Sequence, residues 1–286
     1  MVTITPVSNA HAKSSTPASF SYEALYSGFH IMAGPCSVET REQIHQAAAF
    51  LSSRGVRILR GGAYKPRTSP RSFQGLGEPG LRLMREAADA HGMFVVSEVM
   101  DVETVPVVAE YVDVLQVGAR NMQNFSLLKR LAKERKPVLL KRGLSATIEE
   151  TLSAAEYILQ GNPQVILCER GVRSFEPLTR NMLDLAGAVL LRKMSSLPVI
   201  VDLSHATGRT DIVAPLAAAC VAVGVEGLMV EVHPRPSESV SDAHQAISFP
   251  LFDEILAAME PYLQARAARE ADSSDAAPRV CRASRR

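Results

Sequence analysis

The chain has no tryptophan, only four cysteines and no long apolar run. A membrane-spanning helix needs about 20 consecutive apolar residues, so we expect no membrane partner. The cysteines Cys36, Cys168, Cys220 and Cys281 are widely separated and form no CxxC pair. This spacing argues against a disulfide framework and favours a reducing, cytoplasmic location.

The chain also lacks an excess of charge of either sign. Its 286 residues carry a formal net charge of +1 at pH 7. A nearly neutral chain has no basic surface of the kind that binds nucleic acid, so we expect no nucleic-acid partner. The composition, 47% hydrophobic and 21% charged, is typical of a globular protein with one large domain or two small ones.

The two ends of the chain lack the apolar patterning of its middle. Residues 1–19 are rich in Ser, Thr, Ala and Pro, without the apolar core of a signal peptide. We interpret them as a disordered leader, with a transit peptide as the weaker alternative. Residues 264–286 are rich in Ala, Ser, Asp and Arg and predict a disordered tail, with a basic binding arm as the weaker alternative. The folded domain is therefore expected to be residues 20–263.

Between these ends, eight short apolar runs alternate with longer amphipathic stretches. Runs this short and this rich in Val, Ile and Leu are typical of strands buried on both faces. They comprise residues 31–33, 56–59, 93–96, 112–117, 138–140, 165–167, 199–203 and 228–232. Capping boxes at Thr40 and Thr147, and an N-cap at Asn124, predict helix starts between them.

Eight strand–helix units predict an α/β fold, a (β/α)8 TIM barrel forming a single domain. A doubly wound open sheet is the competing fold. It is disfavoured because no G-x-G-x-x-G pattern follows the first run. In a TIM barrel the active site lies at the C-terminal ends of the strands, and here all eight runs end in polar or reactive residues.

The second run leads into a basic loop, residues 60–71. This loop holds Arg60, Lys65, Arg67 and Arg71 among glycines and prolines. Glycine allows a backbone to approach a ligand closely, and proline stiffens a loop. Arginine and lysine are suited to binding phosphate. The loop therefore predicts a site for a phosphorylated, multiply anionic substrate, with a solvated basic loop as the alternative.

Two sets of side chains follow the eight runs. The cationic set would form a pocket for two phosphates, or for a phosphate and a carboxylate, although one or two members could instead form salt bridges. It comprises Arg60, Lys65, Arg67, Arg120, Lys141 and Arg170. The second set, a thiol, an imidazole and two carboxylates, suits Mn, Fe, Co or Zn better than Mg or Ca. It comprises Cys36, His205, Glu231 and Asp242. Because buried cysteine is often a plain core residue, spacing alone leaves this metal site open.

From about Ile31 to Leu263 the chain resembles the type I-beta 3-deoxy-D-arabino-heptulosonate 7-phosphate (DAHP) synthases, which are related to the 3-deoxy-D-manno-octulosonate 8-phosphate synthases. The segments that carry the resemblance are Ala33-Gly-Pro-Cys-Ser-Val-Glu39, Arg60-Gly-Gly-Ala-Tyr-Lys-Pro-Arg-Thr-Ser69, Gly118-Ala-Arg-Asn-Met122, Leu139-Leu-Lys-Arg-Gly143, Cys168-Glu-Arg-Gly171, Ser204-His-Ala-Thr-Gly208, Met229-Val-Glu-Val-His-Pro234 and Ser241-Asp242.

The resemblance implies that the protein condenses phosphoenolpyruvate with erythrose 4-phosphate and water, giving DAHP and phosphate. This reaction is the first step of the shikimate pathway to the aromatic amino acids. Relatives of this kind are commonly homo-tetramers or dimers, so a homo-oligomer is expected. About 30 residues precede the first predicted strand, too few for the regulatory domains of some relatives, and we expect no inhibition by aromatic amino acids.

The resemblance also implies a role for each site residue. The metal ligands would be Cys36, His205, Glu231 and Asp242. Arg120, Lys141 and Arg170 would bind phosphoenolpyruvate, with Arg60 and Lys65 beside its carboxylate. Arg67, Thr68 and Ser69 would bind erythrose 4-phosphate. The predicted catalytic residues are Lys65, Glu98, Lys141 and His205, and the further predicted substrate contacts are Gln116, Glu169 and Asp202.

Several alternatives remain at this point. An octulosonate synthase would use arabinose 5-phosphate, but the segment from Lys65 to Ser69 differs from the loop of that branch. Cys36 argues against the metal-free octulosonate enzymes, which carry asparagine there. A non-catalytic barrel serving as a binding partner, a generic metal-dependent aldolase and an enzyme of a specialised pathway are the other possibilities.

Overall fold

The structure is a computed structural model that describes residues 19–66 and 69–272. Almost all of the predicted leader, the last fourteen residues of the predicted tail, and Arg67 and Thr68 lie outside the described residues. Among the described helices, none is both long enough and apolar enough to cross a membrane.

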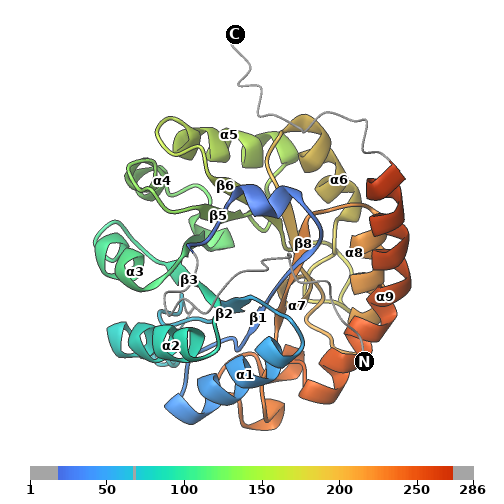
Figure 1. Cartoon of the computed structure of the whole chain (residues 1–286). Helices are drawn as coiled ribbons and strands as arrows, with labels where there is room; N and C mark the ends of the chain where they lie inside the picture. The colour runs from blue at the N-terminus through green and yellow to red at the C-terminus, as the bar shows by residue number, and fades with distance from the viewer. Residues whose placement is uncertain (1–18, 67–68, 273–286) are drawn as a thin grey trace.

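Eight parallel strands form a closed barrel in which each strand pairs with the next along the chain (Figure 1). The strands are β1 (His30–Gly34), β2 (Ile58–Arg60), β3 (Phe94–Val99), β4 (Val114–Val117), β5 (Val138–Lys141), β6 (Val165–Glu169), β7 (Val199–Asp202) and β8 (Gly227–Glu231). Pairing of β1 with β8, from His30 opposite Gly227 to Gly34 opposite Glu231, closes the ring. The predicted TIM barrel is confirmed, and the open sheet is excluded.

The helices form an outer ring around the strands (Figure 1). They are α1 (Arg41–Ser53), α2 (Glu78–Ala90), α3 (Val105–Tyr111), α4 (Phe125–Leu131), α5 (Ile148–Leu159), α6 (Leu185–Met194), α7 (Leu203–Thr207), α8 (Val213–Ala222) and α9 (Phe249–Asp272). Short 3-10 helices are η1 (Glu23–Tyr26), η2 (Ala119–Asn121), η3 (Pro236–Glu238) and η4 (Ala243–Gln245).

Two of the predicted helix starts are confirmed in full. Thr147 and Glu150 form a reciprocal capping box at α5, and the Asn124 side chain accepts a hydrogen bond from Leu127 N at α4. The box predicted at Thr40 is only half formed. Thr40 accepts from Gln43 N, but the Gln43 side chain accepts from Glu39 N, one residue before the expected partner.

Two layers of apolar side chains lie on opposite faces of the strands. The outer layer packs between the strands and the helix ring, and the inner layer fills the barrel around Met32, Val96 and Ile166. Tyr22 and Leu25, at η1, close the inner layer at the N-terminal end of the barrel. The Tyr22 hydroxyl donates to the Val165 carbonyl at 2.8 Å, so this end of the barrel is sealed.

The last helix is longer than the sequence suggested. The disordered tail predicted from residue 264 is wrong for residues 264–272, which continue α9 to Asp272. Alanine, arginine and glutamate are good helix formers, and Arg266 forms an i,i+4 ion pair with Glu270 at 2.8 Å. Arg266 also donates to the Val225 carbonyl at 2.6 Å, which ties the extension to the barrel.

Candidate active site

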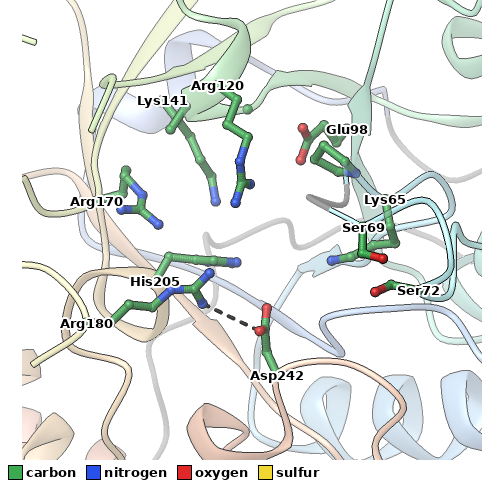
Figure 2. A pocket seen from close by; sticks show the side chains of 13 residues that line it. Lys65, Ser69, Ser72, Glu98, Arg120, Lys141, Arg170, Arg180, His205 and Asp242 are labelled. Atoms are coloured by element: carbon green, nitrogen blue, oxygen red, sulfur yellow. Dashed lines mark ion pairs between the residues drawn. The ribbon is translucent and has the colours of Figure 1, made fainter. Parts of the chain in front are cut away.

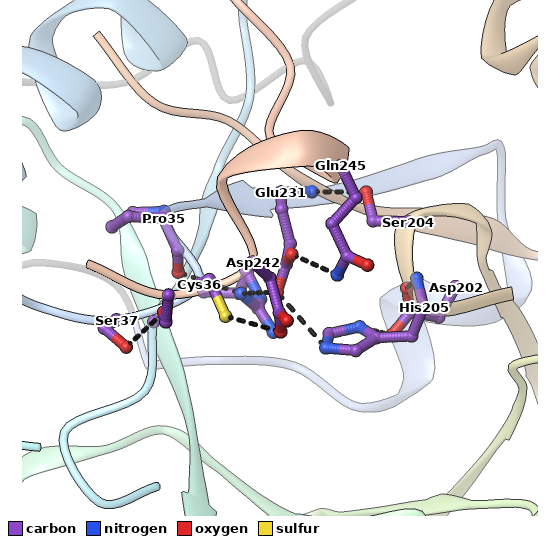
Figure 3. A network of polar contacts seen from close by, with 12 residues as sticks. Pro35, Cys36, Ser37, Asp202, Ser204, His205, Glu231, Asp242 and Gln245 are labelled. Atoms are coloured by element: carbon purple, nitrogen blue, oxygen red, sulfur yellow. Dashed lines mark hydrogen bonds and ion pairs between the residues drawn. The ribbon is translucent and has the colours of Figure 1, made fainter. Parts of the chain in front are cut away.

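Four side chains from distant parts of the chain meet at the C-terminal end of the barrel (Figure 3). Cys36 follows β1, Glu231 ends β8, His205 lies in α7 directly after β7, and Asp242 precedes η4. One ligand atom from each lies within 4.8 Å of the other three. The sequence predicted these four as metal ligands, and the fold brings them into one candidate metal site.

Neighbouring polar groups orient these four side chains. His205 Nδ1 lies 2.8 Å from Asp202 Oδ2, which leaves Nε2 facing Glu231 Oε1 at 3.2 Å. Glu231 also accepts hydrogen bonds from Gln245 at 2.6 Å and from Arg60 at 3.0 Å. A carboxylate behind a histidine, and donors to a ligating carboxylate, are the usual outer contacts of a protein metal site.

The electrostatics of the cluster also fit a cation. Burial, together with the Glu231 carboxylate, raises the pKa of the Cys36 thiol to about 12. Burial opposes the charge on Glu231, but His205 and Arg60 outweigh it and lower its pKa to about 2. Burial lowers the pKa of His205, so its imidazole is a neutral ligand at pH 7. A thiolate needs further positive charge beside it, which a divalent metal ion supplies.

Asp242 is held in an unusual backbone conformation. Its φ of 50° makes it the one described non-glycine residue with positive φ, a region that aspartate enters more readily than most residues. Its carboxylate accepts from Cys36 Sγ at 3.4 Å and lies 3.6 Å from Arg180 Nη1. Arg180 also donates to Gln245 at 2.8 Å. Arg180 therefore supports two parts of the cluster, and the sequence analysis missed it.

A cavity of about 320 Å³ opens beside the metal cluster (Figure 2). It is lined by Lys65, Pro66, Ser69, Ser72, Glu98, Gly118, Ala119, Arg120, Lys141, Arg170, Arg180, His205 and Asp242. In Figure 2, Lys141, Arg120 and Arg170 point into the cavity on one side, with Lys65 and Ser69 opposite. The predicted convergence of cations is thus present in the fold.

The cations of this cavity differ in how the protein holds them. Lys141 forms an ion pair with Asp202, and Lys65 Nζ donates to the Cys36 carbonyl at 2.9 Å. Arg170 is buried, yet its Nη1 has no hydrogen-bond partner among the described residues. A buried donor without a partner costs folding free energy. An anion bound beside Arg170 would remove this cost.

The sequence model of the DAHP synthetase I family matches residues 27–265 of the chain. The chain belongs to the DAHP synthetase I family.

Similar proteins agree with this assignment. A phospho-2-dehydro-3-deoxyheptonate aldolase of Thermotoga maritima is 56% identical over 233 residues, which cover 81% of this chain and 69% of that protein. The crystal structure of a Thermotoga maritima DAHP synthase has 55% identity and a TM-score of 0.81, covering 83% of this chain and 70% of that one. A 2-dehydro-3-deoxyphosphooctonate aldolase of Acidithiobacillus ferrooxidans is 31% identical over 251 residues, 80% of this chain and 87% of the relative.

Within this DAHP synthetase fold, not every predicted site residue reaches the cavity. Lys65, Ser69, Glu98, Arg120, Lys141, Arg170 and His205 line it, whereas Arg60, Gln116, Glu169 and Asp202 do not. Arg67 and Thr68 lie outside the described residues.

Gln116, Glu169 and Asp202 lie behind the cavity and hold neighbouring residues of the site in place. Gln116 donates to Glu98 at 3.2 Å, and Asp202 contacts both Lys141 and His205. Glu169 accepts from Arg142 at 2.9 Å and from Gly171 N at 2.6 Å. These three side chains are not among the residues that line the cavity, and their substrate contacts stay predictions.

Gly118 shows why a small residue is needed beside the predicted catalytic carboxylate. A Cβ at this position would lie 2.1 Å from Glu98 Oε1, far inside van der Waals contact. Glycine at the end of β4 therefore makes room for Glu98 at the cavity wall.

Proposed function

We propose that the protein condenses phosphoenolpyruvate with erythrose 4-phosphate and water, giving DAHP and inorganic phosphate, the first step of the shikimate pathway. The observation that carries this proposal is the junction of the four-residue metal cluster with the cationic cavity, in a chain of the DAHP synthetase I family. Neither half alone would suffice, because the reaction joins two phosphorylated substrates at a polarised carbonyl.

In this proposal the phosphate of phosphoenolpyruvate lies among Arg120, Lys141 and Arg170. Arg170 supports this placement because its Nη1 is buried without a partner among the described residues. Lys65 lies across the cavity, where it can bind the carboxylate of phosphoenolpyruvate. Arg60 does not line the cavity and contributes by its ion pair with the metal ligand Glu231. Fixed cations that hold two anionic substrates side by side remove much of the entropic barrier to their reaction.

The acceptor sugar phosphate occupies the opposite side of the cavity, at Ser69. Arg67 and Thr68, which precede Ser69 in the sequence, stay predicted contacts of this phosphate. Its aldehyde then points toward the metal cluster. A metal bound by Cys36, His205, Glu231 and Asp242 supplies Lewis-acid polarisation of a carbonyl. The mixed sulfur, nitrogen and oxygen donors favour Mn, Fe, Co or Zn over Mg or Ca.

The bond changes of this reaction indicate the roles of the remaining cavity residues. C3 of phosphoenolpyruvate bonds to the aldehyde carbon, water adds at C2, and the C2–O bond to phosphate breaks. One proton of the water ends on the former aldehyde oxygen and the other on the departing phosphate. Glu98, positioned by Gln116, and Lys141, positioned by Asp202, orient this water and move its protons. Arg120 and Arg170 stabilise the leaving phosphate.

The test is a turnover assay that follows phosphoenolpyruvate consumption with erythrose 4-phosphate, before and after chelation. We expect turnover that chelation abolishes and that added Mn restores. The same assay with arabinose 5-phosphate addresses the octulosonate reaction of the 31%-identical relatives. Faster turnover with arabinose 5-phosphate would overturn the proposed acceptor, and no phosphate release with either sugar would favour a non-catalytic barrel.

We also propose that the protein forms a homo-oligomer, a tetramer or a dimer. Phe175 is 94% exposed and Leu178 is 70% exposed, both on the segment between β6 and α6. Large apolar side chains grouped on a surface are typical of subunit contacts. Light scattering after size exclusion should give a multiple of the 30.9 kDa chain mass, and a Phe175→Glu variant should shift toward one chain.

A further inference from the structure

A second cavity of about 200 Å³ adjoins the main one at the C-terminal end of the barrel. It shares Ala119, Arg120, Arg170 and Arg180 with the main cavity and adds Leu144, Arg173 and Asn181. The two cavities therefore meet along a common set of arginines. Nothing in the proposed reaction so far uses the second cavity or Arg173.

The charges around the second cavity are all of one sign. Its lining contains four arginines and no carboxylate, whereas Glu98 and Asp242 line the main cavity. Among the described residues, Arg170 Nη1 is buried without a hydrogen-bond partner, and Arg170 as a whole is 5% exposed. Arg180 has the Asp242 carboxylate at 3.6 Å, but no carboxylate lines the second cavity itself. The guanidinium groups there repel one another, so the site gains stability when an anion lies among them.

The backbone that carries these side chains is fixed at both ends. Arg173 N donates to the Leu144 carbonyl at 2.7 Å, and Asn181 N donates to the Ala206 carbonyl at 2.8 Å. Gly171 turns the chain with a φ of 83°, and a Cβ there would lie 2.9 Å from the Asn181 Cβ. The second cavity is therefore a feature built into the fold at the end of β6.

We propose that the second cavity is a further phosphate site, beside the phosphoenolpyruvate phosphate and sharing Arg120 and Arg170 with it, that receives inorganic phosphate after it leaves C2. This inference rests on the proposed function. When the C2–O bond breaks, the oxygen keeps the bonding electrons and the phosphate takes one proton derived from water. Arg120, Arg170 and Arg180 line both cavities, so the anion moves from one to the other without losing guanidinium contacts.

The phosphate of the sugar substrate is the other possible source of a phosphoryl group. Figure 2 places Arg170 and Ser69 on opposite sides of the main cavity, and the proposed sugar-phosphate position is at Ser69. The second cavity shares Arg170 but not Ser69. It therefore adjoins the position that the departing phosphate occupies, on the side away from the sugar.

Equilibrium dialysis with radiolabelled inorganic phosphate and the full-length protein tests this inference. We expect three phosphates per chain without substrate, at the two proposed substrate-phosphate positions and in the second cavity. One per chain should remain when saturating phosphoenolpyruvate and erythritol 4-phosphate, which lacks the reactive aldehyde, are both present. Arg173→Ala should raise the dissociation constant of this remaining phosphate about tenfold, as expected for one charge-assisted contact. Arg173→Lys should raise it less, because the charge remains.

Arg135→Ala is the matched control. Arg135 is exposed and precedes β5, at the opposite end of the barrel, so its variant should bind phosphate as the parent does. In steady-state assays, phosphate should inhibit the parent in a mixed manner against phosphoenolpyruvate. The same assay should show purely competitive inhibition for Arg173→Ala, since only the main cavity then binds phosphate.

Two results would overturn the second site: displacement of all phosphate by phosphoenolpyruvate and erythritol 4-phosphate together, or equal binding by the Arg173→Ala and Arg135→Ala proteins. The first result would assign the cavity to a substrate phosphate. If one phosphate survives both ligands and phosphoenolpyruvate alone displaces none, the second site stands and the substrate placement under the proposed function fails instead.

Discussion

The two ends of the barrel are built by the same eight strands and yet have opposite chemistry. At the N-terminal end, η1 places Tyr22 and Leu25 on the inner core and seals it. At the C-terminal end, the strands lead into a metal cluster and two cavities lined by cations. Substitutions at the sealed end should therefore lower stability and spare activity. Substitutions of residues that line the cavities at the open end should lower activity and spare stability.

The largest effect is expected at the metal cluster. Cys36→Ala should lower turnover more than about 100-fold, because loss of an outer contact of a metal site already costs up to about 100-fold and Cys36 is a direct ligand. The same change should weaken metal binding measured by calorimetry. The control is Cys220→Ala, which changes another buried cysteine, in α8 on the outer layer. If Cys36→Ala kept full activity after chelation, the metal assignment would be wrong.

A pair of arginines separates function from stability within the open end. Arg170→Ala should lower kcat/KM for phosphoenolpyruvate about 100-fold, a typical loss for one fixed donor to a developing anion, without lowering the free energy of unfolding. Arg142 instead pairs with Glu169 at 2.9 Å and Asp184 at 2.8 Å. Arg142→Ala leaves Glu169 buried and unpaired, and should lower the free energy of unfolding by about 3 kcal/mol.

Chemical denaturation compares the stability of Arg170→Ala and Arg142→Ala, and steady-state kinetics compares their kcat/KM. A large loss of stability in Arg170→Ala would mean that its guanidinium has a structural partner. Unchanged stability in Arg142→Ala would mean that Glu169 and Asp184 do not need it.

At the sealed end, Leu25→Ala should show the opposite pattern. Leu25 is almost fully buried in the inner core, and a leucine-to-alanine change in a core costs about 3 kcal/mol. Thermal denaturation should therefore show a clear loss of stability, while kcat and KM at a permissive temperature should match the parent. A specific loss of kcat would show that the two ends are coupled through the barrel interior.

The smallest expected effect is the pH dependence of stability that arises from His30, at the start of β1. Burial lowers the pKa of His30, although its ring lies 3.0 Å from the Ala24 carbonyl and 2.9 Å from the Ser27 carbonyl. The folded protein therefore binds fewer protons than the unfolded chain, whose histidine pKa is about 6.5. The associated stability is present above that pH and is lost as the pH falls through the folded-state pKa.

Denaturation of the parent and of His30→Gln at pH 8 and pH 5 measures this effect. The parent should lose more stability between the two pH values than the variant does. His205 adds a dependence of the same direction at the other end, because burial lowers its pKa too.

The strands and the cluster could be predicted because their signals are local. Every apolar run overlaps an observed strand, and parallel strands bring their C-terminal residues to one end of a barrel. Cys36, His205 and Glu231 follow or end strands, so their meeting follows from the fold class. The four ligands then form one cluster because closure of the ring places β1 beside β8.

The features that the sequence could not predict depend on how far side chains extend and on how loops fold back. Arg180 lies ten residues after Arg170 in a loop, and no residue pattern in the sequence indicates that it returns to contact Asp242. Glu98 and Gln116 occupy paired register positions, yet only Glu98 lines the cavity. The helical extension of residues 264–272 was missed because composition alone does not reveal the contact of Arg266 with Val225.

Ring closure also sets when the metal site can exist during biosynthesis. Cys36 and Asp242 stand 206 positions apart, and the strand that carries Glu231 is the last of the eight to leave the ribosome. A nascent chain therefore exposes its thiol long before the other three ligands have been made. Metal capture by all four ligands belongs to the closed barrel, and an ion bound by all four reports that β8 has paired with β1.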